Sequence, residues 1–147
     1  MKIVVQRVKE ASVLVGKKIV SSIGRGMVFL VGIEKNDSVE DGEILARKVS
    51  GLRIFEDSTA KMNLSISDVQ GEILAVSQFT LCSDCKKGRR PGFDNAMDPE
   101  GAKKLFNHFI ECVKKYGIVV NTGIFQAYMV VNIANDGPVT FIMDSGK

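Results

Sequence analysis

The sequence predicts an α+β fold rich in β-structure, with an antiparallel, barrel-like sheet covered by two main helices. Three observations support this prediction. Short runs rich in Val and Ile follow one another through the first third of the chain. Two later segments, near residues 38–52 and 98–117, carry apolar side chains at helical spacing. Further strand-like runs continue to the C-terminal end.

The expected strands are residues 3–8, 11–15, 18–23, 27–33, 52–55, 73–81, 118–122, 127–133 and 139–143. The first four follow one another through short turns such as Gly16-Lys17, which favours an antiparallel meander. The run 27–33 is apolar and is expected to be buried on both faces. Residues 135–138 are expected to join the last two strands, and spacing alone favours an ordinary hairpin turn with a trans bond.

The two expected helices have recognisable start signals. Asp37 or Ser38 can cap the first helix. The second is the clearest element in the chain, because Asp98 can cap it, Pro99 suits its first position and Gly117 can end it. The loop before it, residues 82–99, is basic at its start, and loops of this length usually serve a function or are disordered.

The composition predicts one domain, residues 1–147, located in the cytoplasm. A chain of 147 residues with 25% charged side chains resembles an ordinary globular domain. The net charge of +3 is compatible with a nucleic-acid partner but does not require one. No apolar run reaches the ~20 residues of a membrane helix, and the N-terminus turns polar too soon for a signal peptide. Three cysteines cannot all pair, so we expect free thiols in a reducing compartment.

Several common catalytic centres are excluded by the residue inventory. The single histidine, His108, cannot build a multi-histidine zinc site, and it is expected to point into solvent, away from its helix's apolar face. Neither a P-loop nor a dinucleotide-binding glycine pattern is present. Cys82 and Cys85 have C-x-x-C spacing without a second pair and are interpreted as loop thiols, whereas Cys112 is interpreted as a core residue.

Three polar segments remain as candidates for a site. Residues 77–81, Ser-Gln-Phe-Thr-Leu, end a buried strand beside the long loop, where they can bind a ligand or only satisfy backbone groups. Residues 86–91, Lys-Lys-Gly-Arg-Arg-Pro, can hold phosphates and Phe93 can stack on a base, although short charge runs are usually solvated. In residues 135–140, Asn-Asp-Gly-Pro-Val-Thr, Gly137 allows a ligand to approach the backbone. A hydrolase with this inventory must rely on preorganised donors or on its substrate.

Together these segments resemble the D-aminoacyl-tRNA deacylases, also called D-tyrosyl-tRNA deacylases. Residues 77–81 and 135–140 resemble the two signature motifs of that family. The likeness extends over essentially the whole chain and includes Gln6-Arg7-Val8, Phe55-Glu56-Asp57, Lys61-Met62-Asn63-Leu64-Ser65, Lys87-Gly88-Arg89-Arg90-Pro91, Thr122-Gly123, Ala127 and Met129.

The resemblance implies an enzyme and its setting. Family members are cytoplasmic homodimers with a compact β-barrel-like fold and active sites at the subunit interface. They hydrolyse the ester that joins a D-amino acid to the 3′-terminal adenosine of tRNA. Glycyl-tRNA is an implied further substrate, because glycine lacks the side chain that the filter excludes. The resemblance implies no metal, no organic cofactor, no membrane and no DNA partner.

The resemblance also implies roles for particular residues. The pocket for the adenosine and the ester would be lined by Ser77, Gln78, Phe79 and Thr80, with backbone N–H groups near Phe79 and Thr80 as an oxyanion hole. Met129 would lie near the amino acid. The candidate tRNA contacts are Lys86, Lys87, Arg89 and Arg90.

Chiral selection would come from Gly137 and Pro138. In the family their peptide bond is cis and their carbonyls face the active site of the opposite protomer, so an L side chain is excluded by a clash. Arg7 is similar to the family arginine that fixes this motif. Gln126 stands where many relatives have glycine, a departure that could alter the pocket near Met129.

The mechanism and two other functions stay open. Thr80 could be a nucleophile, but no base is near it in sequence, so we favour attack by water assisted by the 2′-OH of the terminal ribose. A non-catalytic RNA-binding module would use the basic loop and Phe93, bind with steep salt dependence and cleave no ester. An esterase for small esters would act without tRNA.

Overall fold

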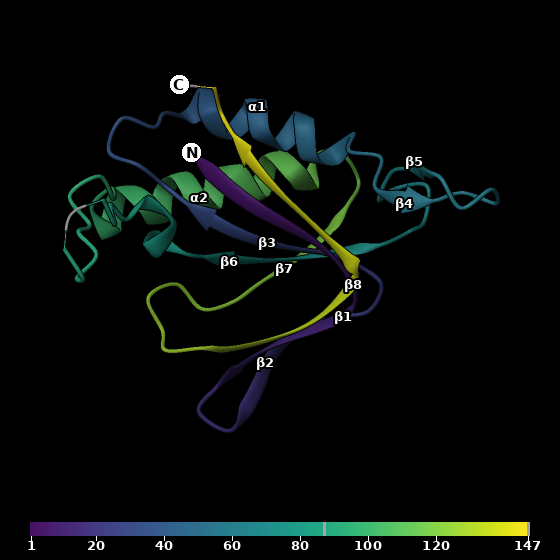
Figure 1. Cartoon of the computed structure of the whole chain (residues 1–147), viewed down its shortest axis with the longest axis horizontal. Helices are drawn as coiled ribbons and strands as arrows, with labels where there is room; N and C mark the ends of the chain where they lie inside the picture. Colours follow the sequence, from purple (N-terminus) through teal and green to yellow (C-terminus); the bar gives the residue numbers. More distant parts are fainter. Residues whose placement is uncertain (87, 147) are drawn as a thin grey trace.

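The computed structural model describes residues 1–86 and 88–146. A curved, six-stranded sheet forms the frame of the molecule, in the order β2-β1-β3-β6-β7 with β8 also paired to β1 (Figure 1). Its strands are β1 (Lys2–Val15), β2 (Lys18–Ile23), β3 (Gly26–Gly32), β6 (Glu72–Ser77), β7 (Val119–Thr122) and β8 (Val130–Asp144). A small second sheet pairs β4 (Phe55–Glu56) with β5 (Met62–Leu64). The predicted fold class, a β-rich α+β fold with a barrel-like sheet and two helices, is confirmed.

The strand directions differ from the antiparallel prediction in one half of the sheet. β3 pairs with β6, and β6 with β7, in parallel. Each of these connections contains a helix, α1 (Val39–Ser50) or α2 (Pro99–Lys114). Parallel neighbours need such a crossover, and successive crossovers of the same hand lie on the same face of a sheet. Both helices accordingly cover one face in Figure 1.

The start signals of both helices are confirmed, whereas α2 ends at Lys114, before the predicted end at Gly117. Ser38 caps α1 in a capping box with Asp41. The side chain of Asp98 accepts a hydrogen bond from the Gly101 N–H at 2.9 Å, and Pro99 is the first residue of α2. Among the described residues, no helix is long and apolar enough to cross a membrane.

Two apolar clusters lie on opposite sides of the sheet. The larger one lies under the helices, where the rings of Phe29 and Phe109 are 6.2 Å apart. The smaller one contains Val13, Val28 and Leu74, and Met129 packs against it. The curved sheet therefore has one face under the helices and another that helps to hold the β7–β8 loop.

The two longest strands are each continuous where the sequence predicted a break. β1 joins the predicted strands 3–8 and 11–15, and β8 runs antiparallel to it from Val130 to Asp144. The predicted hairpin turn at 135–138 is wrong. Instead, the register shifts between the pairs Gln6–Thr140 and Val8–Asn135, so that residues 136–139 bulge opposite Arg7.

Two other predicted strands are shorter in the structure. Only Phe55 and Glu56 of the region around 52–55 join a sheet, as β4. The predicted strand 73–81 ends at Ser77, and the 3-10 helix η1 (Phe79–Cys82) follows it. Gly32 permits this change of direction, because a Cβ there would lie 2.8 Å from the Leu81 Cβ and 3.1 Å from the Cys82 Sγ.

Candidate active site

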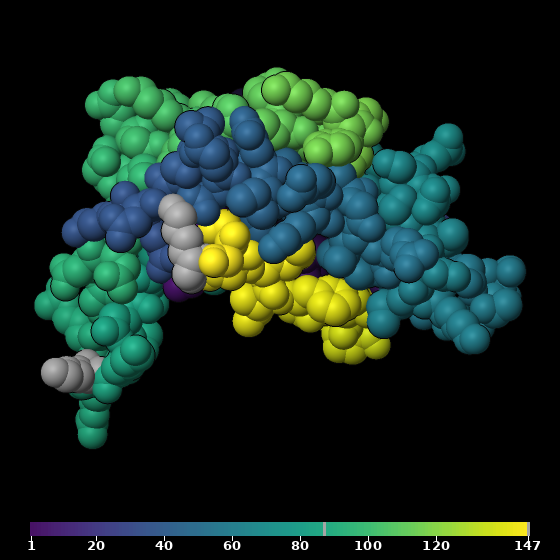
Figure 2. Space-filling view, turned by 90° about the horizontal axis from the view of Figure 1, so that it is seen from above, coloured from purple at the N-terminus to yellow at the C-terminus, as the bar shows by residue number. Residues whose placement is uncertain are grey.

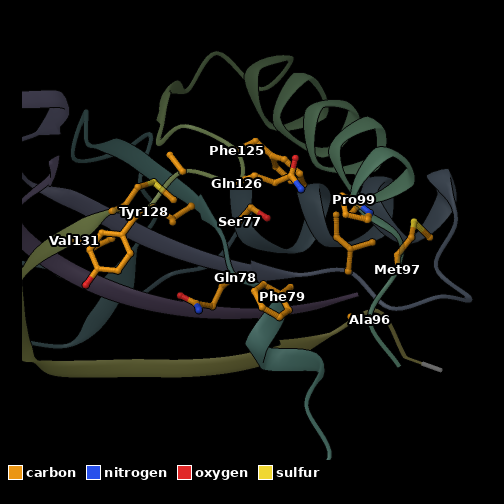
Figure 3. A pocket seen from close by; sticks show the side chains of 15 residues that line it. Ser77, Gln78, Phe79, Ala96, Met97, Pro99, Phe125, Gln126, Tyr128 and Val131 are labelled. Carbon is orange, nitrogen blue, oxygen red and sulfur yellow. The ribbon is translucent and has the colours of Figure 1, made fainter. Parts of the chain in front are cut away.

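A cavity of about 540 Å³ opens at the end of β6. Its walls come from three segments: the β6–η1 junction, the segment that leads into α2, and the β7–β8 loop (Figure 3). Ser77 projects into the middle of the cavity, between Phe125 and Gln126 on one side and Gln78 and Phe79 on the other. The β6–η1 junction therefore brings most of the first predicted motif into one hollow.

The residues of this motif do not alternate between two faces as a strand would require. Ser77, Gln78 and Phe79 all line the cavity, because η1 begins where the predicted strand would have continued. Thr80, in contrast, is outside the described lining and accepts a hydrogen bond from the Gln78 amide at 2.5 Å. Three of the four predicted pocket residues thus line the cavity, and the fourth, Thr80, lies next to them.

An aromatic pair stands at the mouth of the cavity. The rings of Phe79 and Phe93 are 5.1 Å apart, and the two residues are 56% and 38% exposed. Paired exposed aromatic rings form a surface on which a ligand can stack. The pair therefore offers an apolar platform, made of two rings tilted by 60° to each other, beside the polar groups of Ser77 and Gln78.

The basic loop begins beside this platform and is closed at its base by backbone hydrogen bonds. Asp84 and Gly92 exchange backbone hydrogen bonds of 2.8 and 2.9 Å, which closes the loop at its base. Lys86, Arg89 and Arg90 are exposed on it, and Lys87 lies outside the described residues. In Figure 2 the loop projects from the body of the molecule as a teal extension.

The β7–β8 loop supplies the opposite wall. Met129 lines the cavity, as do Phe125 and Tyr128, and Tyr128 is 89% exposed. Gln126 has a φ of 63°, in the left-handed region that favours glycine. Sequence reasoning found Met129 and Gln126 but not the two aromatics, since a lone aromatic in a loop carries no periodic signal.

The second predicted motif lies on the bulge of β8 and is clamped by Arg7. The buried Arg7 donates from Nη1 to the Ile54 carbonyl at 2.7 Å, and its Nε lies 3.1 Å from Oδ2 of Asp136. The Asn135 amide donates to the carbonyls of Arg7 and Val139 at 3.0 and 3.1 Å. Arg7, Asn135 and Asp136 thereby hold the bulge from inside.

Gly137 and Pro138 are exposed at the tip of this bulge. Their peptide bond is cis, and Gly137 has a φ of +118°. A Cβ on Gly137 would lie 2.7 Å from Cγ2 of Val139 and 3.1 Å from Nη2 of Arg7, so no side chain fits without displacing the clamp. Within the described residues, neither Gly137 nor Pro138 lines the cavity of its own chain.

Two interpretations of single residues are wrong. Cys82 is not a loop thiol, because it is buried at the end of η1, and burial raises the pKa of its thiol. His108 does not point freely into solvent: its Nε2 lies 3.4 Å from Oε1 of Glu43 and 3.3 Å from Sγ of Cys112. Cys85 is exposed and Cys112 is buried, as expected.

Comparison with known proteins agrees with this geometry. The family described as D-Tyr-tRNA(Tyr) deacylase matches residues 4–144. Proteins named D-aminoacyl-tRNA deacylase from Fervidobacterium nodosum and Geobacter sulfurreducens are each 54% identical, over 100% and 99% of this chain and 99% and 95% of their own.

Solved structures have the same fold. One titled "c-Myc DNA Unwinding Element Binding Protein" has a TM-score of 0.94 at 45% identity, with both chains fully covered. A second, titled as a probable eukaryotic D-amino acid tRNA deacylase, has a TM-score of 0.84 at 17% identity over 97% of this chain and 98% of its own, a likeness of fold alone. From the full-length sequence matches, the chain belongs to the D-aminoacyl-tRNA deacylase family.

Proposed function

We propose that this protein hydrolyses the ester bond of D-aminoacyl-tRNA and releases the free D-amino acid and tRNA. The observation that carries the proposal is the cavity at the end of β6, with Ser77 inside it and the exposed Phe79–Phe93 pair at its mouth. A 3′-terminal adenosine can stack its base on such a platform and form hydrogen bonds from its ribose and ester to such polar groups. Relatives that are 54% identical carry this activity in their names.

The residues of the cavity divide naturally between the parts of this substrate. The adenine would stack on Phe79, and Ser77 and Gln78 would contact the ribose and the ester. Phe79 and Thr80 open η1, where backbone N–H groups have no acceptor within the helix and can stabilise an oxyanion. Met129 would contact the amino acid from the opposite wall.

The chemical step would use the substrate's own hydroxyl. Among the described residues that line the cavity, Tyr128 alone has an ionisable side chain, and it is 89% exposed. Thr80 is hydrogen-bonded to an amide, which cannot act as its base. Water would therefore attack the ester carbon with help from the 2′-OH, and the 3′-oxygen would leave with a proton.

A second copy of the chain would complete the site. The bulge at Gly137 and Pro138 is exposed and held from inside by Arg7 and Asn135, and β8 also exposes the apolar side chains of Val130, Phe141 and Ile142. In a homodimer built on this strand, each bulge would enter the partner's cavity and clash with an L side chain. Glycyl-tRNA, which has no side chain to clash, would also be cleaved.

The tRNA body would lie along the basic loop. Lys86, Arg89 and Arg90 are exposed on the loop that carries Phe93, so phosphates near the acceptor end can reach them. Lys87, outside the described residues, belongs to the same proposed contact. We assign the protein to the cytoplasm, where aminoacyl-tRNA is used.

The test is hydrolysis of D-tyrosyl-tRNA and L-tyrosyl-tRNA by the purified protein in the presence of EDTA. Rapid loss of the D ester alone is expected. Equal cleavage of both esters would retain a hydrolase and refute the filter. Binding without cleavage would support the RNA-binding module, and for DNA probes we expect no specific binding. Cleavage of small esters without tRNA would favour a general esterase.

One matched pair of variants and two single variants separate the roles. Phe79→Ala should lower kcat/KM by about 10–100-fold through lost stacking, worth ~1–3 kcal/mol, whereas Tyr116→Ala, another exposed aromatic, should not.

Thr80→Ala should retain most activity, whereas complete loss with an intact fold would make Thr80 the nucleophile. Gly137→Ala should weaken chiral selection, and unchanged rate and selectivity would contradict the filter.

A further inference from the structure

A cluster of three potential metal ligands lies between the two helices. His108 and Cys112 are four residues apart on α2, so their side chains share one face of that helix. Glu43 faces them from α1. The His108 Nε2 lies 3.3 Å from the Cys112 Sγ and 3.4 Å from the Glu43 Oε1, and all three ligand atoms lie within 4.8 Å of one another.

The two separations centred on His108 match those between ligands of a tetrahedral zinc ion. Zn–N bonds of about 2.0–2.1 Å and Zn–S bonds of about 2.3 Å at the tetrahedral angle put the nitrogen and sulfur about 3.5 Å apart. A carboxylate oxygen at about 2.0–2.2 Å from the ion lies about 3.4 Å from the nitrogen. Both distances centred on His108 are already near these values, and Glu43 is exposed enough to adjust its rotamer.

The chemistry of the three groups also suits a divalent ion. Imidazole nitrogen, thiolate sulfur and carboxylate oxygen are the three protein ligand types of Zn²⁺. On binding, the Cys112 thiol would release its proton to solvent, so that thiolate and carboxylate balance the charge of the ion. The Cys112 residue is buried, whereas the side chains of His108 and Glu43 are 33% and 59% exposed, which leaves an entry path and room for water as a fourth ligand.

We propose that Glu43, His108 and Cys112 form a zinc site that links α1 to α2. The site is separate from the cavity, to which α2 contributes Pro99 and Ala102 near its first turn. At a rise of 1.5 Å per residue, His108 and Cys112 lie ~9 and ~15 Å along the helix from Ala102. The ion would therefore stabilise the helix layer and take no part in ester cleavage.

Cobalt(II) titration of the metal-free full-length protein is the direct test. Bound Co²⁺ is expected to show a near-ultraviolet thiolate charge-transfer band that saturates at one ion per chain and disappears when Zn²⁺ displaces it. Zn²⁺ should also raise the melting temperature, because it binds the folded state. Cys112→Ser should abolish the band, and His108→Gln should weaken Co²⁺ affinity by at least tenfold.

Control variants make the result specific. Cys85→Ser removes an exposed thiol elsewhere, and Glu111→Gln removes an exposed carboxylate on α2 that pairs with Lys114, so both should bind Co²⁺ as the parent does. Absence of the band in the parent, or its survival in Cys112→Ser, would overturn the site. If Cys112→Ser fails to fold, the His108→Gln variant, at a position whose side chain is one-third exposed, decides the question alone. Deacylation measured in EDTA stays independent of all these outcomes, so failure of the zinc site leaves the proposed function untouched.

Discussion

The bulge at Gly137 and the cavity at the end of β6 are built in opposite ways. The bulge is exposed at its tip but clamped from below by the buried Arg7 and by Asn135. The cavity is bounded by loop segments and by side chains such as Phe79 and Tyr128 that are largely exposed. One region is a projection held by internal contacts, and the other is an open hollow with exposed walls.

This difference follows from what each region is proposed to do. A filter that rejects one enantiomer by steric clash works only if the rejecting atoms cannot move away. A pocket that holds a nucleotide by stacking and hydrogen bonding tolerates small adjustments of its walls. The clamp at Gly137 and the openness around Phe79 are therefore complementary.

The most severe test of the clamp is Arg7→Ala. It would leave the Ile54 carbonyl and the Asp136 carboxylate without their buried partner, so we expect a loss of about 3 kcal/mol in the free energy of unfolding, measured by urea titration. The control is Lys9→Ala, an exposed position two residues further along β1, which should change the free energy of unfolding little. A loss no larger than that of the control would show that the bulge holds its shape without Arg7.

A smaller effect is expected beside the cavity, where β3 contacts η1, from Gly32→Ala. The new Cβ would lie 2.8 Å from the Leu81 Cβ and push η1 away from β3, at a cost of about 1–3 kcal/mol. The loss in kcat/KM for deacylation, expressed as a free energy, should exceed the loss in the free energy of unfolding, because Phe79 moves with η1. Gly24→Ala is the matched control, since its Cβ would approach only Glu72 Oε1, at 3.9 Å. Equal losses of stability and activity in the two variants would mean that the contact between β3 and η1 accommodates the added methyl group.

The β7–β8 wall can be probed with a substitution that relieves strain. Gln126→Gly should raise the free energy of unfolding by about 0.5 kcal/mol. Glycine accepts a φ of 63° without steric cost, but this gain is partly offset because glycine gives the unfolded chain more conformational entropy to lose on folding. Ala60→Gly relieves a similar φ of 59° far from the cavity in sequence and should give the same gain. Only Gln126→Gly should also change kcat/KM. If the two variants have the same kcat/KM, Gln126 does not contribute to substrate binding or turnover.

The smallest effect is expected beside the clamp, in the turn between β4 and β5. Hydrogen bonds from Thr59 lower the pKa of Asp57 to about 2. Because this pKa is below the ordinary value of about 3.9, the turn is stabilised above about pH 4 and loses that stabilisation as the pH falls through about 2. The amide chemical shifts of Thr59 and Lys61 should follow this titration.

Asp57→Asn is the matching variant for this turn. It should shift the Thr59 and Lys61 amides already at neutral pH and leave the Asn135 amide unchanged, whereas the exposed Asp94→Asn should shift none of them. A shift of the Asn135 amide resonance in Asp57→Asn would show that the clamp depends on the turn between β4 and β5 as well as on Arg7.

The parts of the fold that depend on neighbouring residues were predictable. Both helices begin where Ser38 and Asp98 indicated, because a cap and its N–H partners are three residues apart in sequence. The breaks predicted in β1 and β8 were wrong because polar and turn-forming residues there are absorbed by a bulge between two paired strands. The end of β6 at Ser77 depends on Gly32, which is more than forty positions away.

By itself the sequence determined the α+β class, the helices and the two motifs, since composition, capping and apolar spacing act over a few residues. Only the tertiary structure decided that the strands beside the helices run parallel, that Arg7 clamps the bulge at Gly137, and that Glu43 meets His108 and Cys112. These features depend on side chains that meet across the sheet or between helices. No local pattern encodes such distances, because they are set by packing of the whole chain.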